Sequence, residues 1–165
     1  MSFAFSIRPF SPRDAAATAL MRERSIRQIG ARAYSAAQIE AWAARSRDAD
    51  ALAIRLGDGR RAFLAVDADD MPVGLIDLEE DGHIDMLYTA PEAAGQGIAG
   101  RMLSHVDRLA REAGIGLLHT EASEVARPVF ERHGFEVTHR RDFDIDGVPI
   151  HNYKMEKLIF DNQPS

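Results

Sequence analysis

Three glycines in the stretch AAGQGIAGRML, residues 93–103, have the spacing of a phosphate-binding loop. Gly95, Gly97 and Gly100 follow the pattern G-x-G-x-x-G. An acidic residue, Glu121, stands near the distance at which a dinucleotide-binding fold places one. Glycines between a strand and a helix let backbone N–H groups approach a phosphate, and the helix N-terminus adds partial positive charge. The loop therefore predicts an anionic ligand, either NAD or another phosphate compound.

The position of this loop in the chain argues against a dinucleotide. A dinucleotide-binding fold places its glycine turn directly after the first strand, whereas more than half of this chain precedes Gly95. The residues before the loop, HIDMLYTA (83–90), alternate in polarity, and a buried parallel strand is usually a continuous apolar run. We therefore expect a different anion, such as a pyrophosphate.

The same predicted strand carries groups that can move a proton. Period-two geometry puts His83, Asp85 and Leu87 on one face. Because an unperturbed imidazole titrates near pH ~6.5, we expect His83 to accept a proton at neutral pH, with Asp85 orienting it or acting through water. The alternative is that His83 only begins a strand at the solvent edge.

The hydrophobic period defines the elements that position these residues. Residues 3–10 alternate and predict a first strand. Ser11 as N-cap, Pro12 at the first helical position and Asp14 in the first turn predict a helix that runs to about Gly30.

A second helix is predicted from Ser35, with Gln38 at the spacing of a capping box. From there the expected elements are strands at 62–66, 73–79 and 83–90, a helix at 98–113, a strand at 116–123, a helix at 124–134, and a closing hairpin of 135–143 and 148–160 across Asp146 and Gly147. We therefore predict an α/β (α+β) fold for residues 1–165 as a single domain, with a mixed, mostly antiparallel sheet of about seven strands and helices on both faces.

The composition excludes several classes of protein. A formal net charge of -6 argues against a nucleic-acid partner. No cysteine is present, so a disulfide, a thiolate metal site and a cysteine nucleophile are impossible. No segment approaches a run of ~18 apolar residues and the start lacks a secretory signal, so we expect no membrane span and a cytoplasmic protein.

No metal is expected either. The six histidines have no metal-binding spacing. The segment DFDIDG (142–147) matches the first half of a calcium loop, but Tyr153 stands where the loop needs a glutamate. A hairpin turn explains this segment better.

Two longer motifs resemble the GNAT N-acetyltransferase superfamily. LYTAPEAAGQGIAGRML (87–103) is similar to the family's Q/R-x-x-G-x-G/A loop after a strand ending like LYV-x-P, and ASEVARPVFERHGF (122–135) is similar to its N-x-x-A-x-x-F-Y-x-x-x-G-F segment. The opening IRPFSPRDAAATALM (7–21) matches more loosely. The expected element order agrees from end to end, so the resemblance covers nearly the whole chain.

The resemblance implies a GNAT-like fold in which acetyl-CoA lies in a gap between splayed strands. It implies that Leu87 and Thr89 offer backbone groups to pantetheine, and that a backbone N–H near Leu87 stabilises the oxyanion. The residues it places at the cofactor are Leu87, Tyr88, Thr89, Ala94, Gly95, Gln96, Gly97, Ile98, Ala99, Ser123, Ala126 and Phe130.

Two positions depart from the family pattern. Ala94 stands where Gln or Arg is expected, and Phe130 replaces the frequent Tyr that protonates the leaving thiolate. Phe cannot donate a proton. Tyr153 is therefore the candidate acid, although it also fits a core aromatic. His83 stands where some members carry a catalytic Glu.

The implied activity is acetyl transfer from acetyl-CoA to a primary amine, directly in a ternary complex. Without cysteine, Ser123 is the remaining candidate for an acyl-enzyme. The alternative is a non-catalytic CoA-binding sensor, which Ala94 and Phe130 favour. We expect a small-molecule or peptide amine as acceptor, with Trp42, Ile39 and Tyr34 as candidate walls of its pocket, and a homodimer is among the assemblies that the sequence allows.

Overall fold

The computed structural model describes residues 3–159 of the chain. Within these residues eight strands form two four-stranded sheets, with the orders β1-β2-β3-β5 and β4-β6-β8-β7. Among these strands all pairs are antiparallel except β4 with β6. The strands are β1 (Ser6–Pro9), β2 (Arg61–Val66), β3 (Pro72–Leu78), β4 (His83–Ile84), β5 (Leu87–Thr89), β6 (Leu117–Ala122), β7 (Glu136–Ile145) and β8 (Val148–Leu158).

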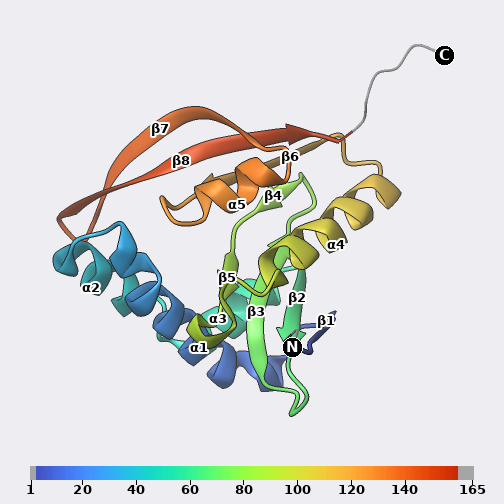
Figure 1. The fold of residues 1–165 in the computed structure, drawn as a ribbon, viewed down its shortest axis with the longest axis horizontal. Coiled ribbons are helices and arrows are strands. Elements are labelled where there is room, and N and C mark those ends of the chain that lie inside the picture. Colours follow the sequence, from blue (N-terminus) through green and yellow to red (C-terminus); the bar gives the residue numbers. More distant parts are fainter. Residues whose placement is uncertain (1–2, 160–165) are drawn as a thin grey trace.

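Helices connect and cover the two sheets (Figure 1). The α-helices are α1 (Ala15–Gln28), α2 (Ala36–Ala44), α3 (Ala49–Leu56), α4 (Ile98–Glu112) and α5 (Arg127–Arg132), and the short 3-10 helices are η1 (Pro12–Asp14), η2 (Gly30–Arg32) and η3 (Pro91–Ala93). The long β7–β8 hairpin lies at one end of the molecule and β1 to β3 at the other.

The expected α/β class is confirmed, and three details differ. The strands divide into two sheets instead of one sheet of about seven. The first strand is shorter than residues 3–10. Helix α3 was not expected; Asp48 caps it by accepting a hydrogen bond from the Ala51 N–H at 3.0 Å, and Leu52 is among the side chains it buries.

The capping signals act locally, as the sequence predicts. At α2 the Gln38 N–H donates to the Ser35 hydroxyl at 3.2 Å, while the Ser35 N–H donates to the Gln38 side chain at 2.8 Å. Asp146 and Gly147 both have positive φ and form the turn between β7 and β8. These interactions fix the start of α2 and the turn of the β7–β8 hairpin.

The main core lies around β3, which is buried along its whole length and packs against both α1 and α4. Gly74 of β3 permits this close approach, because a Cβ there would lie 2.8 Å from Met102 of α4. A second, smaller core joins α1 and α2 to the β7–β8 hairpin; its buried members are Ile26, Tyr34, Ile39, Ala43, Ile145 and Ile150.

Tyr34 connects three segments that are distant in the sequence. Its hydroxyl donates to the carbonyl of His151 in β8 at 2.8 Å and accepts from the N–H of Glu124, before α5, at 2.8 Å. Tyr34 itself lies between α1 and α2. The turn between these helices is thereby attached to the second sheet.

Candidate active site

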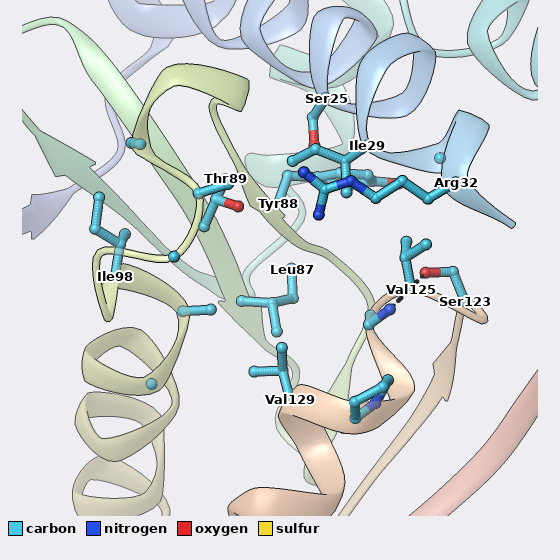
Figure 2. A pocket seen from close by; sticks show the side chains of 18 of the residues that line it. Ser25, Ile29, Arg32, Leu87, Tyr88, Thr89, Ile98, Ser123, Val125 and Val129 are labelled. Atoms are coloured by element: carbon cyan, nitrogen blue, oxygen red, sulfur yellow. Dashed lines mark hydrogen bonds between the residues drawn. The ribbon is translucent and has the colours of Figure 1, made fainter.

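A cavity of about 470 Å³ lies between β5 and the segment that follows β6. Figure 2 shows its walls, which come from α1 and the turn after it, from β5, from the glycine loop and from the start of α5. The side chains or backbones that line it include Ser25, Ile29, Arg32, Trp42, Leu87, Tyr88, Thr89, Ala94, Gly95, Gly97, Ile98, Ala99, Ser123, Ala126, Val129, Arg132 and His133.

The cavity exists because the strand expected at residues 83–90 is broken. The buried Asp77 carboxylate accepts hydrogen bonds from the N–H groups of Asp85 at 2.8 Å and Met86 at 2.9 Å, so these two residues leave the ladder. The part before the break, β4, pairs with β6, and the part after it, β5, pairs with β3. His83, Asp85 and Leu87 therefore do not share one strand face, which corrects the expectation from the alternating pattern.

The register of β5 directs the backbone groups of two of its residues toward the cavity. The Ala90 N–H donates to the Val73 carbonyl at 2.9 Å. Because hydrogen-bonded and non-hydrogen-bonded pairs alternate in an antiparallel ladder, Tyr88 is in a hydrogen-bonded pair with β3, whereas Leu87 and Thr89 are not. Their backbone N–H and C=O groups face away from β3, toward the gap, where an extended ligand can pair with them.

The glycine loop forms the entrance to α4. Gly95 and Gly97 have φ of 78° and 80°, in the region that side chains disfavour, and Gly97 is the N-cap of α4. Ile98 and Ala99, in the first turn of the helix, also line the cavity. Their N–H groups belong to the first turn, which lacks intrahelical acceptors, so the loop presents donors and the positive end of the helix dipole to an anion.

Gln96 is placed differently from its neighbours. Its backbone N–H donates to the Ala93 carbonyl at 3.3 Å. Gln96 lines a separate depression next to the cavity, together with Phe5 and Arg101. The structure therefore does not bring Gln96 into the cavity with the rest of the loop.

The start of α5 forms the opposite wall. Ser123 and Ala126 line the cavity, and the Ser123 hydroxyl accepts a hydrogen bond from the Ala126 N–H at 3.1 Å. Phe130, expected at the cofactor, is 2% exposed and packs edge-on against Phe135 in the core. It does not line the cavity; Val129 of the same helix does.

His83 is held between two carboxylates outside the cavity lining. Its Nε2 lies 2.5 Å from Glu121 and its Nδ1 lies 2.6 Å from Glu79. Carboxylates only accept hydrogen bonds, so the doubly protonated ring fits this position. The hydrogen bond with Glu121 raises the pKa of His83 to about 9 and lowers that of Glu121 to about 2. An imidazole with this pKa is mostly protonated at neutral pH, which argues against the expected role of His83 as a base there.

Asp85 is also occupied by ion pairs. Its Oδ2 lies 2.7 Å from Arg60 and 2.6 Å from Arg55. The same Arg60 guanidinium, with a side chain only 6% exposed, also pairs with Asp77 at 2.8 Å. Asp85 therefore belongs to the charge cluster that supports the strand break, and it neither contacts His83 nor lines the cavity.

Tyr153 lies on β8 outside the cavity lining. The Arg127 guanidinium stacks 4.6 Å above its ring, and the Glu124 carboxylate raises the pKa of its hydroxyl. Glu124 in turn lies 2.6 Å from His151. The structure gives Tyr153 a packing environment and does not bring it together with Leu87.

Several cavity residues were missed by sequence reasoning. Ser25, Ile29 and Arg32, from α1 and η2, line the cavity. No spacing signal marks them, because only the docking of α1 against β5 brings them there. Of the expected acceptor walls Trp42 lines the cavity, whereas Ile39 and Tyr34 belong to the second core.

The chain belongs to the GNAT acetyltransferase family, since the model of the acetyltransferase (GNAT) domain matches residues 30–157. It is 30% identical over 149 residues to the uncharacterized N-acetyltransferase YafP of Escherichia coli K12, covering 90% of this chain and 93% of that protein. A crystal structure of a GCN5-related N-acetyltransferase from Rhodopseudomonas palustris is 33% identical, with a TM-score of 0.87 over 96% of this chain and 98% of that one.

A more distant structure has the same fold. PaiA N-acetyltransferase from Thermoplasma acidophilum, solved in complex with coenzyme A, is 22% identical, with a TM-score of 0.73 over 94% of this chain and 99% of that one. Within residues 3–159 no helix is long and apolar enough to cross a membrane. Across the same span, no three His, Asp or Glu side chains are grouped so that they could hold a metal ion.

Proposed function

We propose that this chain transfers the acetyl group of acetyl-CoA to a primary amine while both substrates are bound. The observation that carries the proposal is the cavity, where strand-edge groups of β5 and the donors at the start of α4 face one space. Acetyl-CoA has the matching chemistry, because pantetheine has peptide-like amides and the pyrophosphate is an anion.

In this arrangement the backbone binds most of the cofactor. Leu87 and Thr89 pair with the pantetheine amides, as an added strand would. Gly95, Gly97 and the first residues of α4 bind the pyrophosphate. That coenzyme A is bound by a structural relative, PaiA, supports this assignment.

The chemical step requires little from side chains. The amine nitrogen attacks the thioester carbonyl carbon, the new C–N bond forms, the C–S bond breaks, and coenzyme A leaves as a thiolate that takes up a proton. The Leu87 N–H stabilises the negative charge on the carbonyl oxygen. The proton lost from the nitrogen passes to water, since His83 is already protonated and Asp85 is paired with two arginines.

Direct transfer is favoured over an acyl-enzyme. The chain has no cysteine, and the Ser123 hydroxyl is engaged as a hydrogen-bond acceptor, with no histidine bonded to it among residues 3–159. A Ser123→Ala variant is therefore expected to retain turnover. Abolished turnover, together with an acetyl adduct on Ser123 in the wild type, would contradict direct transfer.

Calorimetric titration with acetyl-CoA, with NADH as the control ligand, tests the cofactor assignment. We expect saturable binding of acetyl-CoA alone, followed by release of free thiol when amines are added. Absence of acetyl-CoA binding would overturn the proposal. Binding without thiol release from any amine would instead identify a CoA-binding sensor of the same fold.

A further inference from the structure

The charged side chains that line the cavity are cationic. Arg32 and Arg132 line it, and among residues 3–159 no aspartate or glutamate does. This is unexpected for a chain with a formal net charge of -6. The lining is therefore positively charged in more than one part of the cavity, which favours anionic ligands there.

The two arginines lie in different parts of the cavity. Arg132 is the last residue of α5, and the next residue, His133, lies beside the glycine loop, with its Nε2 2.9 Å from where a Cβ of Gly100 would be. These groups accompany the donors of the loop and suit the phosphates of the cofactor. Arg32 comes instead from η2 and extends toward Tyr88 and Ile29 in Figure 2.

Arg32 differs in its contacts from a nearby arginine. It forms no side-chain hydrogen bond or ion pair with any of residues 3–159, whereas Arg27, five residues earlier, pairs with Glu40 at 2.7 Å and Glu23 at 3.2 Å. A guanidinium carries five donors in a planar fork that suits a carboxylate. Arg32 is thus free to bind one in the cavity.

A second arginine lies on the same side of β5. The Arg22 guanidinium stacks 5.1 Å from the centroid of the Tyr88 ring, and Tyr88 lines the cavity. The Nε of Arg22 is buried and has no hydrogen-bond partner among residues 3–159. Arg22 does not line the cavity itself, so it adds positive charge behind the Tyr88 ring and makes no direct contact with the cavity.

We propose that the acceptor amine carries a carboxylate, which Arg32 binds on the α1 side of the cavity, with the charge of Arg22 behind Tyr88 supporting it. This inference rests on the proposed function and names the class of its acceptor: a compact amino acid or an equivalent anionic amine. Ile29 and Tyr88 lie near Arg32 (Figure 2) and Trp42 also lines the cavity, so the rest of the acceptor is apolar. A polyamine does not fit, because its additional positive charges would face arginines and no carboxylate of the lining.

Matched pairs of acceptors test the carboxylate directly. Thiol release is measured with phenylalanine against phenethylamine and with leucine against 3-methylbutylamine, and spermidine represents polyamines. We expect kcat/KM to be at least ~10-fold higher for the amino acid of each pair, as a charge-assisted hydrogen bond provides.

The variant Arg32→Gln tests whether this residue binds the carboxylate. We expect it to reduce the preference for the amino acid by about 10-fold or more, while the Kd of acetyl-CoA changes less than twofold. Arg45→Gln is the matched control, because Arg45 is exposed at the end of α2 and does not line the cavity. Since Arg32 is also exposed, its replacement is expected to leave folding intact.

Two outcomes would overturn the inference. One is a wild-type preference for spermidine or for the decarboxylated amines. The other is a loss of acetyl-CoA affinity in Arg32→Gln that is as large as the loss of acceptor discrimination, which would assign Arg32 to the cofactor phosphates.

Calorimetry on protein saturated with coenzyme A separates this inference from the proposed function. Binding of phenylalanine but not phenethylamine, without any thiol release, would support the carboxylate site and contradict catalysis. Thiol release only with amines that lack a carboxylate would support catalysis and contradict the carboxylate site. No binding and no turnover with any member of the panel would contradict both.

Discussion

Strands β4 and β5 are two residues apart in the chain, yet they contribute to the protein in opposite ways. Around β4 the groups that could do acid–base chemistry are side chains, and they are all engaged: His83 between Glu79 and Glu121, and Asp85 with two arginines. Around β5 the exposed groups are peptide N–H and C=O, which face the cavity. The comparison indicates that charged side chains build the strand break here, and that the break exposes the backbone groups to which we assign cofactor binding.

Removing Asp77, which supports the strand break, is expected to have the largest effect on stability. Asp77→Ala leaves Arg60 buried without its central partner and removes the acceptor for the Asp85 and Met86 N–H groups. We expect a loss of about 3–5 kcal/mol in the free energy of unfolding, measured by urea denaturation.

Asp58→Asn is the control for that measurement. Asp58 pairs with the same guanidinium, but its side chain is 47% exposed, so we expect a much smaller loss than for Asp77→Ala. Equal losses in the two variants would contradict a special role for the carboxylate at the break.

The β5 side of the comparison is tested at the glycine loop. Gly97→Val places a branched side chain at φ of 80°, at the helix end where the anion is expected. The strain and the displaced N–H groups should weaken acetyl-CoA binding by ~10-fold or more, or about 1.4 kcal/mol. Gly114→Val is matched, because Gly114 has φ of 76° after the far end of α4 and is equally open. If both variants bind equally weakly, strain alone explains the effect.

Phe130→Tyr tests whether a family-like tyrosine would restore an acid at this site. Phe130 is buried against Phe135, so an added hydroxyl would be desolvated among apolar groups. We expect a loss of about 1 kcal/mol in unfolding free energy and no gain in kcat. An increase in kcat would show that this position reaches the cofactor after all.

The smallest effect is the pH dependence of the β4 cluster. The pKa of His83, about 9, lies above its ordinary value, so its contribution to stability is complete below pH ~6.5 and is lost as the pH rises through about 9. Glu121, with a pKa lowered to about 2, loses its contribution only as the pH falls toward that value. The melting temperatures of wild type and His83→Gln should therefore converge between pH 7 and ~10. A constant difference between them over this range would exclude the pairing of His83 with the carboxylates.

Local features of the fold were predictable, and the site was only partly so. The capping box at Ser35, the turn at Asp146 and the glycine loop are specified by neighbouring residues, so their patterns suffice. The break after β4 depends on a carboxylate from β3, and alternation alone cannot reveal it.

Dependence on distant segments also explains the two remaining differences between the predicted and the observed site. Phe130 and Val129 are adjacent on α5, and only the rotation of the helix decides that Val129 lines the cavity. Arg32 carries no sequence signal, because its position depends on how α1 and η2 dock against β5. Both are properties of packing between distant segments.

The double hydrogen bond of the Tyr34 hydroxyl has a kinetic consequence. The turn that it attaches forms part of the cavity wall, and moving this turn would break both bonds and expose a buried ring. Lids that open during turnover belong to the least stable parts of proteins. The turn between α1 and α2 is instead held by both hydrogen bonds of Tyr34. We therefore expect ligand exchange to be governed by diffusion into a standing cavity, with rates that follow solvent viscosity and not a conformational step of the wall.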